Sequence, residues 1–527
     1  MNTGDRAINI QQFVVTADQM RQIEGRVFAA GMPVAALMEK VAGRITQRVQ
    51  ALDCYQPALR VGVLVGPGHN GGDALVVARE LHFSGCQVRI YQPFERLKDL
   101  TATHGAYCQS LGIPFSQDIA TLQHCDLLID GLFGFGLERL LEGTVAEAIA
   151  QLNQWTIPIV SIDLPSGLHT DTGEVLGTAI RATHTLCLGL WKQGLLQDPA
   201  LAWSGQTELV EFDLPLTDIQ AVVGEGMVRR ITPAVALAHL PLTRSPTAYK
   251  YRVGHLLLVC GSRRYAGAAL LAGLGARGSG VGMLSIAVPE SVKPLFSDRL
   301  PEALIIGCPE TESGAIADLP IEVEGYDAIG CGAGMTLEAL PVIQQVLSSD
   351  RPLVLDADGL NALAQLGTVA TLQARTATTV LTPHLGEFKR LFPELSVPMN
   401  CRITATRTAA QQTGAIVLLK GARTTIADAQ TVWINPDSSS ALARGGSGDV
   451  LTGLTSGLLA QAIASEQAVT TLEVVKSAAW WHSQAGILAA QERTVLGVDP
   501  ATLASYLIPA ISSLAGSSPH NLAPARF

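Results

Sequence analysis

The strongest constraint on the fold is a repeated pattern in which an apolar strand ends in a glycine-rich loop and a helix follows. Residues 60–65 (RVGVLV) are the first such strand, and the loop at 66–73 (GPGHNGGD) leads into a helical pattern. The same alternation recurs at 125–136 (CDLLIDGLFGFG) and at 157–167 (IPIVSIDLPSG). Apolar strands that alternate with helices predict a mostly parallel sheet with both faces covered.

A second series of the same kind begins at 254–261 (GHLLLVCG) and ends at 441–449 (ALARGGSGD), which opens a long apolar helical pattern. Between the two series, turn residues and local charges accumulate. The length of 527 residues suits two to four domains. We therefore predict two successive three-layer α/β domains. The predicted boundaries are a first domain at 1–225, a linker at 226–248, a second domain at 249–515 and a flexible tail at 516–527.

The charge balance excludes one large class of partners. Lys and Arg number 36 whereas Asp and Glu number 46, which gives a formal net charge of −10. Because phosphate backbones bind basic surfaces, this balance argues against a nucleic-acid-binding protein. Backbone N–H groups at a helix N-terminus can still hold small phosphates, so an acidic chain remains compatible with nucleotides.

The cysteines and the apolar runs indicate the compartment. Nine cysteines are scattered without a C-x-x-C pair, which is typical of a reducing compartment and argues against a thiolate metal site. The sequence has no apolar run of the roughly 18 residues that span a bilayer, and residues 1–10 lack the apolar core of a signal peptide. We therefore expect a cytoplasmic protein that does not bind membranes.

Polar residues follow the strands of the first series. Asp130 and Asp163 end two of the apolar runs, and Ser166 follows the second. The carboxyl ends of parallel strands face the crevice where open α/β sheets bind ligands. Asn70, Asp130 and Ser166 offer oxygen atoms, which suit a hard cation rather than zinc. The alternative is that these side chains cap helices and turns, and that the loop at 66–73 is a tight turn without a ligand.

The loop at 445–448 carries the sharper signal of the second series. Successive glycines before a helix N-terminus form a nest of N–H donors for a phosphoryl group. Asp449 follows in the first helical turn, where its carboxylate can accept a proton from an alcohol. The alternative is that Asp449 only complements the helix dipole.

Two further segments of the second series follow buried strands. Residues 420–424 (KGART) can grip nucleotide phosphates, or they form a β-turn whose charges are solvated. His384 has Glu387 nearby, and it either contacts a ligand or plays a structural role.

The motifs together match known families. GPGHNGGD, DGLFGFG (130–136) and DLPSG (163–167) resemble the signature of the NAD(P)H-hydrate epimerases. YAGAALLAG, LDADGLNAL, LTPHLGEF, LLKGART and GGSGDVLTG resemble the ADP-dependent NAD(P)H-hydrate dehydratases of the ribokinase-like superfamily. Their order and spacing match over nearly the whole chain, which therefore resembles the bifunctional family that repairs hydrated NAD(P)H. This resemblance implies a Rossmann-like first domain and a ribokinase-like second domain.

The sequence departs from the family pattern at four places. His69 replaces an asparagine, Ala74 replaces a glycine, and GCGAG at 330–334 stands where the family commonly has G-P-G-L-G. Arg444 precedes the anion loop where a smaller residue is usual. That arginine either adds a phosphate contact or points to solvent.

The resemblance implies one reaction for each domain. The first would interconvert the R and S hydrates at C6, with Asp163 as the acid/base group, assisted by Lys192. A potassium ion would be held there by Asn70, Asp130 and Ser166. The second would dehydrate the S epimer by phosphorylating its hydroxyl from ADP, with magnesium sharing the transfer and Asp449 taking the hydroxyl proton.

The resemblance also implies the remaining contacts. In the epimerase the hydrate would contact His69, Asn70, Gly71, Gly72, Asp73, Gly134, Phe135, Gly136, Leu137, Glu138, Arg139, Leu140 and Asp163. In the dehydratase the hydrate would contact Ala268, Gly334, His384 and Asp449. ADP would contact Lys420, Gly421, Ala422, Arg423, Thr424 and Gly448.

An alternative function is a ribokinase-like small-alcohol kinase fused to a non-catalytic Rossmann-like module that binds nucleotides or proteins. The epimerase-like motifs in front of the second domain, and the TPHLGE and KGART segments, favour the repair enzyme. For the repair enzyme the expected partners are its small-molecule substrates, and a homo-oligomer is expected because such folds commonly assemble.

Overall fold

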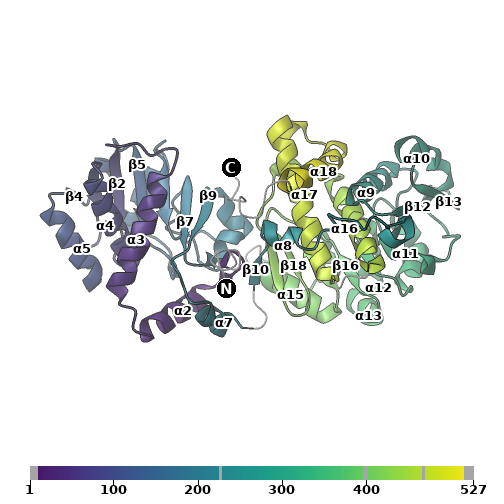
Figure 1. Cartoon of the computed structure of the whole chain (residues 1–527), viewed down its shortest axis with the longest axis horizontal. Helices are drawn as coiled ribbons and strands as arrows, with labels where there is room; N and C mark the ends of the chain where they lie inside the picture. Colours follow the sequence, from purple (N-terminus) through teal and green to yellow (C-terminus); the bar gives the residue numbers. More distant parts are fainter. Residues whose placement is uncertain (1–9, 225–227, 396–401, 466–468, 516–527) are drawn as a thin grey trace. The chain divides into compact units, whose positions relative to one another are not determined.

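The computed structural model describes residues 10–224, 228–395, 402–465 and 469–515. The chain divides into two compact units, Met1–Met227 and Val228–Arg526, each built of strands and helices (Figure 1). Both sheets are mostly parallel, so the predicted α/β class is confirmed. Across the described ranges, none of the helices combines the length and apolarity that crossing a bilayer requires.

The first unit holds a seven-stranded sheet in the order β4-β3-β2-β5-β6-β7-β9, with every neighbouring pair parallel. A short parallel pair, β1 with β8, lies outside it. The strands are β1 (Val14–Val15), β2 (Arg60–Val65), β3 (Gln87–Tyr91), β4 (Phe115–Ser116), β5 (Leu127–Gly131), β6 (Ile159–Ile162), β7 (His184–Leu188), β8 (Trp191–Lys192) and β9 (Gln206–Val210).

Helices cover both faces of this sheet because its strands are apolar on both sides. Val63 joins one buried cluster, with α3 and α4, whereas its neighbour Leu64 joins another, with α6. The alternation follows from successive strand residues pointing to opposite faces. The helices are α2 (Ala17–Ala29), α3 (Val34–Gln50), α4 (His69–Phe83), α5 (Asp99–Ser110), α6 (Gly143–Leu152) and α7 (Leu216–Val223).

The second unit holds a ten-stranded sheet in the order β10-β19-β18-β17-β16-β15-β14-β11-β12-β13. Strand β18 is antiparallel to both of its neighbours, and the other pairs are parallel. The strands are β10 (Val228–Arg230), β11 (His255–Val259), β12 (Met283–Pro289), β13 (Leu304–Cys308), β14 (Ala328–Cys331), β15 (Leu353–Leu355), β16 (Thr379–Leu381), β17 (Ile416–Leu419), β18 (Thr424–Ala427) and β19 (Val432–Asn435).

Helices α9 and α16 approach each other closely beside the glycine-rich loop at 445–448, which is called the phosphate loop below. A Cβ atom at Gly275 on α9 would lie 2.1 Å from the carbonyl oxygen of Val450 on α16, so only glycine allows this contact. Both helices share one buried cluster with α8, α17 and α18. The helices are α8 (Pro233–Leu237), α9 (Ala266–Ser279), α10 (Pro294–Arg299), α11 (Leu340–Leu347), α12 (Ala357–Leu366), α13 (Thr368–Gln373), α14 (Leu385–Leu391), α15 (Arg402–Thr413), α16 (Ser447–Ala464), α17 (Thr471–Arg493) and α18 (Pro500–Ala515).

The structure differs from the predicted linker at 226–248. Residues 228–230 form β10, which pairs in parallel with β19 at the edge of the second sheet. Ala236 of α8 is buried in the core of the same unit. A strand of three residues with two arginines lacks an apolar pattern, which is why the sequence did not indicate it. The predicted tail at 516–527 lies outside the described residues.

Candidate active sites

A cavity of about 700 Å³ lies at the carboxyl ends of β2, β5 and β6 in the first unit. Its wall is formed by α2, α3, the start of α4 and the loop that follows β5. Ten of the residues expected to contact the hydrate line this cavity. They are His69, Asn70, Asp73, Gly134, Phe135, Gly136, Leu137, Glu138, Arg139 and Asp163.

The segment expected as a glycine loop is largely helical. Helix α4 begins at His69, and Gly68 is its N-cap, so residues 69–73 form its first turns. A Cβ at Gly71 would lie 2.0 Å from the carbonyl oxygen of Gly66, and one at Gly72 would meet Met38. Neither glycine lines the cavity; they allow close packing behind its wall instead. Leu140 is exposed and also stays outside the lining.

Asp163 is the most constrained residue of this site. It follows β6 with φ of +70°, a left-handed backbone conformation that Asp adopts more readily than most residues. The Lys192 Nζ lies 2.6 Å from Asp163 Oδ1, and both side chains are buried. The backbone N–H groups of Phe135 and Leu188 donate to the same carboxylate at 3.0 and 3.2 Å. Three hydrogen-bond donors therefore hold this buried carboxylate at the wall of the ligand cavity.

Burial and charge act in opposite directions on Lys192. Burial, the largest single effect, lowers the pKa of its ammonium, but the interactions with Asp163, Cys187 and Glu24 together outweigh it and the net pKa shift is upward. The ammonium also donates to the carbonyl oxygen of Leu188. The assistant role predicted for Lys192 thus has a geometric basis, since it fixes and neutralises the Asp163 carboxylate.

Asp130 and Ser166 are brought together as predicted, but mainly by bonding to each other. The Ser166 hydroxyl donates to Asp130 Oδ1 at 2.6 Å, and the Ser166 N–H donates to Oδ2 at 2.9 Å. Ser161 adds a bond to Oδ2 at 2.8 Å, and the Phe133 N–H donates to the Ser166 hydroxyl at 2.8 Å. Asp130 thereby ties the loop after β6 to the loop after β5.

Sequence reasoning missed Glu24. This residue of α2 lines the same cavity, and burial raises the pKa of its carboxyl to about 7. A signal was present, since Glu24 lies four residues after Met20 and three before Val27, which are both buried on one face of the helix. A carboxylate within an apolar stripe indicates either a buried partner or a site.

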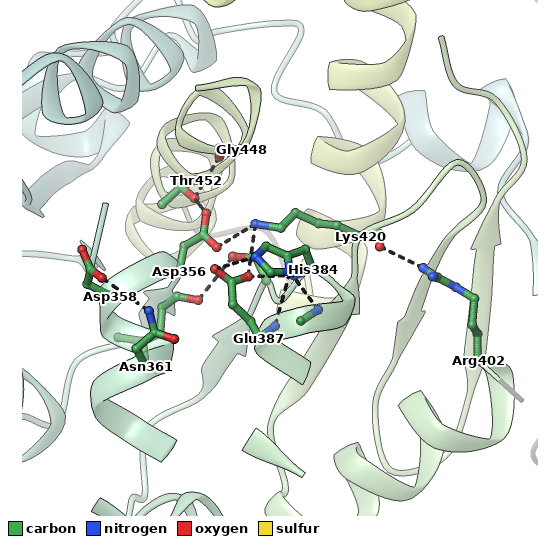
Figure 2. A network of polar contacts seen from close by, with 12 residues as sticks. Asp356, Asp358, Asn361, His384, Glu387, Arg402, Lys420, Gly448 and Thr452 are labelled. Carbon is green, nitrogen blue, oxygen red and sulfur yellow. Dashed lines mark hydrogen bonds and ion pairs between the residues drawn. The ribbon is translucent and has the colours of Figure 1, made fainter. Parts of the chain in front are cut away.

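The second site lies at the carboxyl ends of β15 and β17 and at the start of α16 (Figure 2). Lys420, which follows β17, places its Nζ 2.7 Å from Asp356 Oδ1, and Asp356 follows β15. The other Asp356 oxygen accepts a hydrogen bond at 2.6 Å from Thr452 on α16. Three elements that are distant in sequence are therefore joined through one buried carboxylate, which the sequence alone did not indicate.

Asp449 lies one turn before Thr452 on α16, and its carboxyl has a perturbed pKa. Burial raises this pKa to about 7, and the charge of Asp356 adds to the effect, while Lys420 opposes it. Helix α16 begins at Ser447 after Gly446, which has φ of +100°. A Cβ at Gly448 would lie 3.4 Å from Lys420 Nζ, so the start of this helix faces the lysine.

His384 has the structural one of the two roles that were left open, since it is the N-cap of α14 within the network drawn in Figure 2. Its Nδ1 accepts from the N–H of Gly386 at 2.9 Å, and the Glu387 carboxylate accepts from the N–H of His384 at 2.8 Å. Its side chain is still 56% exposed, which leaves the ring accessible to a ligand. Glu387 also lies 4.0 Å from Lys420 Nζ.

The other predicted contacts of the second unit fall into two groups. Ala268 and Gly334 adjoin, because a Cβ at Gly334 would lie 2.8 Å from the Ala268 Cβ. Gly421, Ala422 and Arg423 lie in the turn between β17 and β18, and the hydroxyl of Thr424, the first residue of β18, closes this turn by donating to the Gly421 carbonyl at 3.1 Å. Arg402, which sequence reasoning missed, supports this turn by donating to the carbonyls of Leu419 and Lys420 at 3.0 and 2.9 Å.

Two departures from the family pattern have structural outcomes. Burial and the charge of Lys98 lower the pKa of His69, so its neutral imidazole lines the first cavity. Arg444 donates to the carbonyl oxygen of Leu496 at 2.8 Å on an exposed surface. In this structure Arg444 therefore binds the backbone rather than pointing freely to solvent.

Comparisons with known proteins cover both units. The family model described as YjeF-related protein N-terminus matches residues 34–194, and the model described as NAD(P)H-hydrate dehydratase matches residues 256–509. The bifunctional NAD(P)H-hydrate repair enzyme of Synechocystis sp. is 52% identical over 96% of this chain and 96% of its own length. The enzyme of the same name from Thermosynechococcus vestitus is 51% identical over 94% of this chain and 97% of its own.

Among solved structures, the ADP/ATP-dependent NAD(P)H-hydrate dehydratase of Bacillus subtilis, co-crystallised with ATP and Mg²⁺, is 32% identical. It covers 53% of this chain and 95% of its own, with a TM-score of 0.44. The family resemblance inferred from the motifs is confirmed by the full-length relatives, and a small-alcohol kinase is not favoured. The chain belongs to the family of bifunctional NAD(P)H-hydrate repair enzymes.

Proposed function

We propose that this chain repairs hydrated NADH and NADPH through one reaction in each unit. The first unit interconverts the R and S hydrates at C6, and the second dehydrates the S epimer with ADP as phosphoryl donor. The proposal rests on an arrangement of side chains that occurs in both units. In each unit a buried carboxylate pairs with a lysine at the carboxyl ends of parallel strands, Asp163 with Lys192 and Asp356 with Lys420.

In the first unit, Asp163 acts on the hydroxyl of the hydrated ring. Its carboxylate is held against the cavity by Lys192 and two backbone N–H groups, so it can take a proton without moving. The cavity of about 700 Å³ has room for a nicotinamide ring with part of its ribose. Residues 134–139 and the first turn of α4 line the rest of the cavity and would contact the remainder of the dinucleotide.

The donor set of the first unit fits a potassium ion. Asp130 is a single carboxylate, Ser166 adds a hydroxyl, and no three His, Cys, Asp or Glu side chains cluster as ligands within the described parts of the chain. Asn70 would add its amide oxygen to this set, while its NH₂ group, which is buried without a hydrogen-bond partner among the described residues, can donate to the hydrate. A bound potassium ion would supply positive charge between the loops that Asp130 joins.

In the second unit, Asp449 takes the proton of the C6 hydroxyl while that oxygen accepts the terminal phosphoryl group of ADP. The N–H groups at the start of α16 and the Lys420 ammonium stabilise the charge of the transferred group. Elimination of phosphate then restores the 5,6 double bond, because phosphate leaves more readily than hydroxide. A magnesium ion bound with ADP would neutralise phosphate charge near the acidic residues Asp356, Asp358 and Glu387.

The hydrate of this second site would lie beside Ala268, Gly334 and His384. Ala268 and Gly334 adjoin, and the His384 ring is accessible. ADP would lie along the turn at 420–424, which Arg402 supports from behind, and next to Gly448.

The cellular location and the oligomeric state are also part of the proposal. A cytoplasmic location is supported by the eight described cysteines, all of which are free thiols. A homo-oligomer rests on the resemblance to the family alone.

The experiment is incubation of the purified chain with mixed hydrates of NADH, with and without ADP. We expect reduced nicotinamide, AMP and phosphate to form in equal amounts, and only when ADP is present. A stable phosphate ester of an alcohol, without recovery of reduced nicotinamide, would instead support a kinase.

A further inference from the structure

A further carboxyl group of the first cavity, that of Glu24, lies close enough to Lys192 and Asp163 for their charges to act on it. Glu24 belongs to α2, which begins two residues after β1. Strand β1 pairs in parallel with β8, with Val15 opposite Lys192. This pairing brings α2 to the Asp163–Lys192 pair, and Glu24, Asp163 and Lys192 all line one cavity.

The Glu24 carboxyl is available for chemistry. No hydrogen bond or ion pair engages its oxygens within the described parts of the chain, whereas Asp163 has three donors. Helix α2 is itself firmly anchored, since Thr16 and Gln19 form a capping box at its start and Met20, Ile23 and Val27 are buried. Glu24 is therefore held in place by its helix and not by bonds to its own side chain.

We propose that Glu24 is a second catalytic group of the epimerase site and exchanges a proton with the ring nitrogen N1 while Asp163 serves the C6 hydroxyl. The inference rests on the proposed epimerase function of this unit and assigns the partner acid that such a reaction needs. Asp163 and Glu24 come from different elements, the end of β6 and α2, and both line one cavity, so they can reach two different atoms of one ring.

The proton balance requires two groups. C6 carries both the hydroxyl and N1, so Asp163 removes the hydroxyl proton, a C=O bond forms at C6, and the C6–N1 bond breaks. The electron pair of that bond goes to N1, which takes the proton of Glu24. After the carbonyl rotates, N1 attacks its other face, returns its proton to Glu24, and the oxygen recovers its proton from Asp163. No external reductant, oxidant or water is consumed.

Two other acidic residues line the cavity. Glu138 is exposed and pairs with Arg21 at 3.1 Å. Burial, with the charges of Asp163 and Glu24, raises the pKa of Asp73 well above its usual value, which favours its protonated form. The pKa of Glu24 lies at about 7, raised by burial, lowered by Lys192 and raised by Asp163. A carboxyl with a pKa near neutrality can both give and take a proton at physiological pH.

The test is the rate at which purified R hydrate of NADH converts to the S epimer, with the uncatalysed rate subtracted and ADP omitted. We expect Glu24→Gln to lower kcat by about 10²–10⁴-fold with KM nearly unchanged, because glutamine keeps the shape but cannot exchange the proton. Glu24→Asp should recover part of the loss. The matched control is Glu147→Gln, which alters an exposed glutamate on α6 outside the cavity.

The pH profile separates a catalytic role from a structural one. In the wild-type chain the rate should fall as pH rises through about 7, because Glu24 loses the proton it must donate. The groups whose charges interact with it are Asp73 on α4, Asp163 after β6 and Lys192 in β8, and none of them is changed in Glu24→Gln. The cavity is also lined by Arg21, His69, Lys98, Glu138 and Arg139, which that variant likewise leaves unchanged. In that variant the remaining epimerisation rate should therefore no longer decrease as pH rises through about 7.

Three results would overturn the inference. One is full activity of Glu24→Gln. Another is an epimerisation rate that still decreases above pH 7 in Glu24→Gln but no longer does so in Asp73→Asn. The third is equal loss in Glu24→Gln and Glu24→Asp together with a lower unfolding midpoint, which would make Glu24 structural. Absence of epimerisation in the wild-type chain would instead refute the proposed function of the unit.

Discussion

The ammonium of Lys192 lies 2.6 Å from the Asp163 carboxylate in the first unit, and both side chains are buried. Removing two charges from water costs more free energy than a single contact returns, so a buried pair of this kind is retained for a reason other than stability. Its position at the ligand cavity indicates that the reason is catalysis. Because each charge compensates the other, removing either side chain would leave the other as an unpaired buried charge.

Lys192→Met should therefore destabilise the first unit strongly, because it leaves the Asp163 carboxylate buried without its cation. We expect a loss of about 3–5 kcal/mol in the free energy of unfolding. Chemical denaturation followed by circular dichroism measures it. Lys40→Met is the control, since Lys40 pairs with Asp213 at the surface at 2.7 Å and should cost about 1 kcal/mol or less. Equal losses in the two variants would contradict the account.

Asp163→Asn should separate the two reactions. Asparagine tolerates the left-handed backbone at this position, where alanine would add strain, but it leaves the Lys192 ammonium buried without its anion, so the first unit should also lose stability as in Lys192→Met. We expect conversion of the R hydrate to fall by about 10²–10⁴-fold while dehydration of the S hydrate continues at its normal rate. Chromatography of the two epimers measures both reactions. Asp99→Asn, an exposed change at the start of α5, serves as the control, and unchanged epimerisation in Asp163→Asn would remove Asp163 from the proposed role.

Dehydration of the S hydrate should be faster at higher pH, because Asp449 must lose its proton before it can act as a base. Burial and the charge of Asp356 set the pKa of Asp449 at about 7, so the rate should rise as pH increases through that value. Asp356→Asn removes a negative charge and should move this rise to lower pH. The exposed change Asp298→Asn should leave it in place. A wild-type rate that does not change with pH near 7 would exclude Asp449 as the base.

Gly275→Ala should separate α9 from α16 and disturb the phosphate loop. The added Cβ would lie 2.1 Å from the Val450 carbonyl oxygen, which backbone atoms cannot accommodate without a shift. We expect a lower unfolding midpoint of the second unit and loss of dehydration. Gly267→Ala on the same helix has open space around the new Cβ and should be neutral or slightly stabilising, by up to about 1 kcal/mol. Thermal unfolding of both variants measures the difference between their unfolding midpoints.

The sequence predicted the positions that follow directly from strand order. Asp130, Asp163 and Lys420 each end a buried apolar run, and parallel strands bring such ends to one edge of a sheet. Each glycine segment lies at the start of a helix, although residues 69–73 already belong to α4 and residues 447–448 to α16. The exact start of α4 was not predicted, because glycines at 71 and 72 have low helix propensity, while their close packing against Gly66 and Met38 requires the helix.

The contacts that the sequence could not predict join distant segments. Glu24 reaches the first cavity through the β1–β8 pair, whose strands have two residues each and carry little pattern. Asp356, which follows β15, and Thr452 on α16 are joined by a hydrogen bond although neither the strand nor the helix pattern relates them. Such pairs depend on tertiary packing, which a single sequence does not encode in its local periodicity.

The most direct test of the account uses the pure R hydrate of NADH as the only hydrate. Without ADP, the wild-type chain should form the S epimer and no reduced nicotinamide, and with ADP the absorbance of reduced nicotinamide should recover completely. Asp163→Asn and Asp449→Asn should each block recovery, and a mixture of the two variants should restore it, because the S epimer can pass between molecules through solution. Recovery from the R hydrate by Asp163→Asn alone, or recovery without ADP, would contradict the assignment of one reaction to each unit.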